Sequence, residues 1–171
     1  GGTVSVSYSV IDKCYQGTFF VRSFTITPAP AVVVNGPEDN RSNACSYADQ
    51  AAADAAFAAW LAQFNVSGGC APSGSFGEGT PSAPAYCGGA TTVTYTVTDK
   101  CYQTSVRTAT FTITPAPIVG VNVPSDMSSN ACSYADQDAA NAAYDAWIAS
   151  FSVSGGCAPV GGFSDEQTAP S

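Results

Sequence analysis

The same sequence returns after 87 positions along this chain, and this internal repeat limits the folds open to it more than any other feature. The stretch GGTVSVSYSVIDKCYQ that begins at Gly1 returns as GGATTVTYTVTDKCYQ at Gly88, and NACSYADQ at Asn43 returns at Asn130. Three pairs of cysteines keep the same distance: Cys14 and Cys101, Cys45 and Cys132, and Cys70 and Cys157. A unit of this length is a small domain, longer than the units that stack into solenoids.

Two Pro-Ala-Pro segments, at 28–30 and 115–117, are the predicted linkers between repeats. Proline cannot donate to a strand ladder, and it stiffens the chain. These linkers divide the chain into the C-terminal part of one repeat (1–27), a complete repeat (31–114) and the N-terminal part of the next (118–171). We therefore expect the chain to be a window on a longer array, with its modules arranged head to tail.

Two segments of the complete repeat alternate between apolar and polar residues with the period of a half-buried strand. The first, Thr91 to Thr98, places Val93, Tyr95 and Val97 on one face. The second places Ala109, Phe111 and Ile113 inward, and a polar turn at 99–103 joins the two. The pattern predicts an antiparallel pair of strands that closes the module.

Between Ser46 and Phe64 the apolar residues recur every three or four positions, which predicts an amphipathic helix with Ser46 or Asp49 as its N-cap. The third repeat keeps this stripe. At helical spacing beside a sheet, these side chains are expected to form core and not a ligand groove. The predicted helix-core residues are Phe57, Trp60, Leu61, Phe64, Tyr144, Trp147, Ile148 and Phe151.

Seven cysteines without any histidine favour disulfides over zinc, and therefore an oxidising compartment. A helix of about 15 residues rises about 22 Å, and the extended chain after it is long enough to return along it. Length therefore predicts the pairs Cys45–Cys70 and Cys132–Cys157. The partners of Cys14, Cys87 and Cys101 stay open, because Cys87 and Cys101 flank one strand. Either the chain bends sharply near Gly88-Gly89, or Cys101 reaches the neighbouring module.

Charge and composition argue against several classes of function. The chain has 13 acidic and 5 basic residues, so nucleic acids and anionic membranes are poor partners. No apolar run reaches the length of a membrane helix, and Gly1-Gly2-Thr3 does not resemble a signal peptide. We expect no catalysis. The acidic pairs Glu38-Asp39 and Asp165-Glu166 are read as solvated loop charge.

No cofactor is expected, and calcium is the lesser alternative. Carboxylates near strand ends or junctions could bind calcium, which needs six to eight oxygens, but there is no Asp-x-Asp-x-Asp loop. Tyr15 and Tyr102 are predicted to pack at the junctions. The sequons at 40–42 and 65–67 are attributed to chance. The candidate calcium carboxylates are Asp12, Glu38, Asp39, Asp99 and Asp126.

Four segments, NACSYADQAAADAAFAAWLAQF, SGGCAP, CGGATTVTYTVTDKC and TATFTITPAP, resemble the HYR-like repeats of large Bacteroidota surface proteins, which include gliding-motility and biofilm adhesins. The resemblance implies tandem Ig-like β-sandwich modules and export to the cell surface, often by the type IX route. In this chain Val106-Arg107-Thr108 stands where many relatives carry another cysteine. This difference leaves the pairing of Cys101 and Cys14 open.

The expected protein is thus mainly β, with one amphipathic helix inserted in each Ig-like module, and it lies outside the bacterial cell. The leading hypothesis is a structural segment of a long stalk, filament or adhesin, whose partners are neighbouring repeats and possibly identical chains. The alternative is a module that binds glycans or a partner protein multivalently. Segment 74–84 differs from 161–171 more than the strands differ, which favours the spacer.

Overall fold

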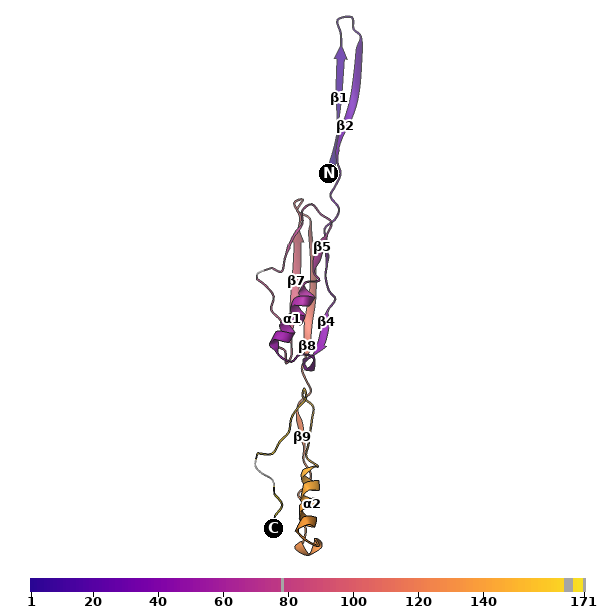
Figure 1. Cartoon of the computed structure of the whole chain (residues 1–171). Helices are drawn as coiled ribbons and strands as arrows, with labels where there is room; N and C mark the ends of the chain where they lie inside the picture. Colours follow the sequence, from indigo (N-terminus) through magenta and orange to yellow (C-terminus); the bar gives the residue numbers. More distant parts are fainter. Residues whose placement is uncertain (78, 165–167, 171) are drawn as a thin grey trace. The chain divides into compact units, whose positions relative to one another are not determined.

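The structure is a computed structural model that describes residues 1–77, 79–164 and 168–170 (Figure 1). These residues form a mainly β fold with two α-helices. The chain divides into two compact units, Gly1–Asp39 with Ala58–Pro81 and Thr92–Thr110, and Asn40–Phe57 with Ser82–Thr91 and Phe111–Ser171. The long strands of the central repeat contribute residues to both units.

The central repeat contains a four-stranded sheet in the order β4 (Asn40–Asn43), β8 (Thr104–Thr114), β7 (Gly89–Thr98) and β6 (Ser73–Ser75). β4 lies parallel to β8, and β6 lies antiparallel to β7. Both predicted alternating runs are strands, and their apolar positions are buried, including Val93, Val97, Phe111 and Ile113. On the other face, threonine hydroxyls pair between the strands, at 3.1 Å for Thr94 and Thr108.

The predicted helix is α1 (Gln50–Leu61), which follows a short 3₁₀ helix, η1 (Ala44–Ser46). Of the two predicted caps, Asp49 accepts the backbone N–H of Ala52 at 2.9 Å. Phe57 and Trp60 are buried, and Leu61 and Phe64 are half-buried. α1 lies beside the long strands of the sheet (Figure 1). It packs on them through the rings of Phe57 and Phe111, whose centroids lie 5.4 Å apart in an edge-to-face arrangement.

The chain after α1 forms one strand of a separate, two-stranded sheet. β5 (Asn65–Ser67) pairs antiparallel with β3 (Val33–Asn35), which places Val66 opposite Val34. Val32, Val34 and Val97 form a buried cluster with Phe64, Val66 and Tyr95 packed against it. After β5 the chain turns at Gly68 and Gly69, both with positive φ, and Gly69 donates to the carbonyl of Pro30 at 3.1 Å.

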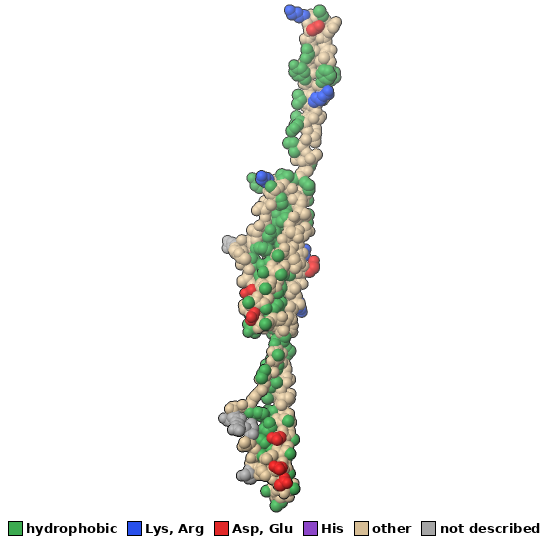
Figure 2. Space-filling model, viewed as in Figure 1, with side chains coloured by type: hydrophobic (Ala, Val, Ile, Leu, Met, Phe, Trp, Pro, Cys, Tyr) green, Lys and Arg blue, Asp and Glu red, His purple; other side chains and the backbone are tan. Residues whose placement is uncertain are grey.

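The first repeat segment folds as the hairpin β1–β2, formed by β1 (Gly2–Ile11) and β2 (Gly17–Ile26). Its sequence matches β7 and β8, but all of its residues are exposed. Val6 is 60% exposed where Val93 is 3% exposed, and Phe24 is 71% exposed where Phe111 is 1% exposed. Figure 2 shows the hydrophobic side chains along the surface of this hairpin.

The third repeat segment contains β9 (Gly120–Asn122), η2 (Ala131–Ser133), α2 (Gln137–Ile148) and β10 (Ser152–Ser154). Trp147 donates to the carbonyl of Ser125 at 3.0 Å, as Trp60 donates to that of Glu38. No residue of α2 is buried. The predicted core residues Tyr144, Trp147, Ile148 and Phe151 are half-buried.

We predict that Phe111→Ala destabilises the central repeat by about 3–5 kcal/mol, because it removes a fully buried ring and leaves a cavity. Val106→Ala on the same strand is the control, since Val106 is exposed, and it should change the free energy of unfolding by less than about 0.5 kcal/mol. Denaturant titration measures both. Equal effects of the two substitutions would contradict the described core.

Candidate functional site

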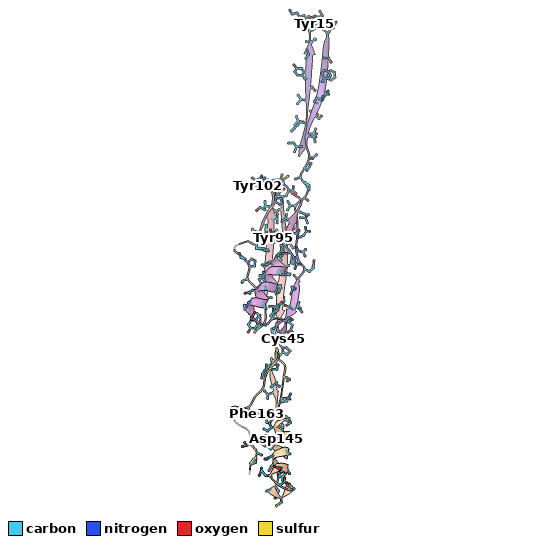
Figure 3. All side chains as sticks on the ribbon, viewed as in Figure 1. Tyr15, Cys45, Tyr95, Tyr102, Asp145 and Phe163 are labelled. Atoms are coloured by element: carbon cyan, nitrogen blue, oxygen red, sulfur yellow. A yellow bond between two sulfur atoms is a disulfide. The ribbon has the colours of Figure 1, made fainter. Side chains whose placement is uncertain are left out.

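Within the described residues, one disulfide joins Cys45 of η1, labelled in Figure 3, to Cys157 of the third repeat segment. Their α-carbons lie 5.0 Å apart, and 112 positions separate them in sequence. Gly156, next to Cys157, donates to the carbonyl of Pro117 at 2.9 Å. The disulfide therefore spans the linker 115–117 and connects the central repeat to the third repeat segment.

This bond corrects both predicted pairings, Cys45–Cys70 and Cys132–Cys157. The expectation that the chain returns along α1 to Cys45 is wrong, because β5 pairs with β3 and carries the chain to Pro30 instead. Cys70 then lies beside Lys100, whose N–H donates to the Cys70 carbonyl at 3.0 Å. In the third repeat segment, Gly156 makes the corresponding hydrogen bond to Pro117, and the next residue, Cys157, is bonded to Cys45.

Cys87 lies at the same junction. It lines one cavity together with Cys45, Cys157, Tyr47 and Tyr86. The chain bends sharply after Cys87, since Gly88 has φ 139° and its α-carbon faces the ring of Pro115 with no room for a Cβ. The Cys87 thiol raises the pKa of Tyr86, mainly through a side-chain hydrogen bond.

A second cysteine group consists of Cys70, Cys101 and Asp99, whose sulfur and carboxylate atoms all lie within 4.8 Å of one another. Asp99 is buried and accepts the backbone N–H groups of Cys70 at 2.9 Å, Cys101 at 2.8 Å and Gln103 at 2.9 Å. These bonds, with that of Cys70 first, lower the pKa of Asp99 although burial raises it. A hydrogen bond with the Cys70 thiol is the main cause that raises the pKa of the Cys101 thiol.

This group does not fit a metal well. It is the one set of three possible metal ligands that the structure brings together within the described residues. Three backbone N–H groups already occupy the Asp99 carboxylate, so only two thiols face outward from the set. Structural zinc takes four ligands. The chemistry that two adjacent, exposed thiols offer is disulfide formation.

Four of the five candidate calcium carboxylates, including Asp99, contact separate groups of the protein. Asp12 accepts the N–H groups of its own turn, from Cys14 and Gln16. Glu38 pairs with Arg107 at 3.0 Å, and Asp39 accepts the N–H of Thr110 at 2.8 Å. Asp126 is exposed. Asp165 and Glu166 lie outside the described residues.

Tyr15 and Tyr102 lie at the tips of their hairpins and are exposed (Figure 3). Both have positive φ, 64° and 61°, which fits the tight turn after each aspartate. The residues that meet at the junction belong instead to the Gly-Gly-Cys-Ala turn, which occurs at 68–71 and again at 155–158. In both copies its two glycines and its alanine have positive φ, Ala71 at 49° and Ala158 at 52°.

Comparison with protein-family models, with curated proteins and with solved structures found no match for this chain. The resemblance to HYR-like repeats therefore stays a hypothesis. Among the described residues, none of the helices has the length and apolar character required to cross a bilayer.

We predict that Cys45→Ser lowers the free energy of unfolding by about 2–5 kcal/mol, because the disulfide closes a loop of more than 100 residues. Peptide mapping of the wild type should recover the Cys45–Cys157 link, and the variant should contain one additional free thiol. Cys14→Ser, which removes an exposed free cysteine, is the control and should leave the stability of dilute protein unchanged. Recovery of a Cys45–Cys70 peptide would contradict the structure.

We predict that Asp99→Asn lowers the melting temperature at pH 7 more than Asp12→Asn does, because Asp99 alone accepts the additional bond from Cys70. The pKa of Asp99 is lowered in the fold. Its contribution is therefore complete above the ordinary carboxyl pKa of about 4 and is lost as the pH falls through the lower, folded value. Melting curves from pH 7 to pH 2 should show a smaller acid-induced decrease for Asp99→Asn than for wild type.

Proposed function

We propose that this chain is a structural segment of a long extracellular stalk, filament or adhesin that extends from the bacterial cell surface and performs no catalysis. Its repeats would be Ig-like β-sandwich modules in tandem. The observation that carries the proposal is the Cys45–Cys157 bond, which ties consecutive repeats together over a proline linker.

A covalent link in this place is suited to bearing tension. Force applied along the chain passes through the disulfide, so the 112-position loop between Cys45 and Cys157 is bypassed. The linker of two prolines around one alanine spans only about 10 Å in the extended polyproline conformation. A short, stiff connection closed by a covalent bond favours a constant geometry from one repeat to the next.

The strand surfaces also support a structural role. Facing hydroxyl groups form rows across both hairpins, as in Thr3 with Thr25 at 2.9 Å and Thr92 with Thr110 at 3.1 Å. Such cross-strand pairs stabilise a sheet without charge. With 11% charged residues, the surface depends little on ion pairs that salt would screen.

One observation favours the alternative, a module that binds glycans multivalently. A groove beside α2 is lined by Tyr134, Tyr144 and Trp147, and aromatic faces bind ligands well. In the central repeat, however, the counterpart of Tyr144 is Phe57, which packs against Phe111 of the sheet. The structural role is therefore the better supported of the two.

We predict a mechanical signature of the link. When single chains are held at both ends and stretched, reduction should add about 370–400 Å of contour length, because 112 residues at about 3.3–3.6 Å each are released. Cys45→Ser should give the longer length without reductant. Equal lengths for oxidised and reduced wild type would show that the bond carries no load.

Electron micrographs of the native assembly test the function itself. A stalk should appear as a fibre of beads at constant spacing. A compact particle in which 31–114 packs beside 118–171 would contradict the proposal, as would saturable glycan binding without any fibre.

A further inference from the structure

Two turns of the central repeat meet at the end where β7 passes into β8, and each presents a cysteine thiol. Turn 68–71, which follows β5, contains Cys70. Turn 99–103 contains Cys101 and Tyr102, which is labelled in Figure 3. Both thiols are free and exposed. Their sulfur atoms lie within 4.8 Å of each other and of a carboxylate oxygen of Asp99.

The Asp99 carboxylate positions the backbone of both cysteines. Its Oδ2 accepts the N–H of Cys70 at 2.9 Å, and its Oδ1 accepts the N–H of Cys101 at 2.8 Å. The N–H of Lys100 donates to the Cys70 carbonyl at 3.0 Å. Two of these bonds join the two turns, and the third orders the turn of Cys101. The thiols are therefore positioned before any bond forms between them.

The close approach of the two turns depends on Gly69, which has φ 68°. A Cβ at this position would lie 2.5 Å from a methyl carbon of Val32 and 3.2 Å from the Cβ of Asp99. Val32 belongs to the buried cluster of the central repeat. The meeting of Cys70 and Cys101 is therefore a property of the folded repeat.

The two thiols are not equivalent. A hydrogen bond with the Cys70 thiol is the main cause that raises the pKa of Cys101. Cys101 therefore keeps its proton to a higher pH than an ordinary cysteine does. Because the thiolate is the nucleophile in disulfide exchange, Cys101 is slow to attack a disulfide from solution. The first attack is accordingly assigned to Cys70.

We propose that Cys70 and Cys101 form a redox-active pair, in which Cys70 reacts with a small disulfide and Cys101 completes a bond within the repeat. With glutathione disulfide, the Cys70 thiolate forms a mixed disulfide and releases one glutathione thiolate. Cys101 then loses its proton to solvent, and its sulfur attacks Sγ of Cys70 and releases the second glutathione. Two cysteine thiols are oxidised, and one glutathione disulfide is reduced to two thiols.

The pair controls what else Cys70 can bind. Cys70 is the counterpart of Cys157, whose sulfur forms the link to Cys45. A sulfur takes part in one disulfide at a time, so the bond to Cys101 prevents Cys70 from forming a link of this kind. Attack by Cys101 would also release such a link. This consequence rests on the proposed structural role and adds a redox control of the links between repeats.

The test follows glutathione on the whole chain at low protein concentration. After incubation with glutathione disulfide and acid quenching, unreduced peptides are mapped by mass spectrometry. Chymotrypsin cleaves after Phe64 and Phe76 and so separates Cys70 from the other cysteines. Wild type should yield the Cys70–Cys101 peptide. Cys101→Ser should retain glutathione on Cys70, with an occupancy at least about tenfold that of wild type, because the second thiol is no longer held beside it.

Cys14 is the internal control of this experiment. Its turn has the same DKCYQ sequence and the same two hydrogen bonds to an aspartate. It should retain glutathione in wild type and in Cys101→Ser alike.

Thermal melting is the second readout. The Cys70–Cys101 bond closes a loop of about 30 residues, so oxidation should raise the melting temperature of the central repeat by at least about 10 °C. Cys70→Ser and Cys101→Ser each replace an exposed thiol and should show no such increase.

Three results would each overturn the inference: equal glutathione on Cys70 in wild type and Cys101→Ser, recovery of Cys101 only in links to other chains, or a melting temperature that oxidation leaves unchanged. The same digests test the structural role separately. Recovery of the Cys45–Cys157 peptide would leave that role intact when the pair fails, whereas its absence would contradict the role and not the pair.

Discussion

Burial of the inner face of β7 and β8 is the interaction on which the central repeat depends. Phe111 packs against Phe57 of α1, and Val97 packs with Val32 and Val34. The hairpin β1–β2 forms the same strands in matching register with its inner face exposed. In the central repeat this face is covered by α1 and by the paired strands β3 and β5, which precede β7 in the same repeat.

Strands and helices depend on local patterns, whereas their packing depends on segments that are distant in sequence. This difference explains which parts of the fold could be predicted from the sequence. Strands with period two and a helix with period 3.6 are local signals, and both were predicted at the correct places, with α1 ending a few residues inside the expected limits. The disulfide was not, because length alone allowed the chain after α1 to return to Cys45 or to continue away from it. The pairing of Val34 with Val66 decides between these paths, and no local pattern encodes that choice.

The repeat itself left two pairings of Cys45 open. Cys45 and Cys70 recur at the same distance, so a bond between them and a bond from Cys45 to the next copy of Cys70 are equally compatible with the sequence. A bond within a repeat would stabilise that repeat alone. The bond between Cys45 and Cys157 also restricts the linker 115–117, so that the stability of one repeat and its position relative to the next become linked.

The two aspartate turns show how folding controls the chemistry at the repeat end. Asp12 and Asp99 both accept two N–H groups of their own turn, but only Asp99 also accepts the N–H of Cys70, which β5 delivers. Cys70 and Cys101 are thus brought together only after the repeat has folded around its helix. Two thiols held this close are at a high effective concentration for forming a disulfide with each other. The chemistry open to Cys101 and to Cys14 therefore differs through the fold and not through the local sequence, because DKCYQ surrounds both cysteines and only Cys101 has the Cys70 thiol beside it.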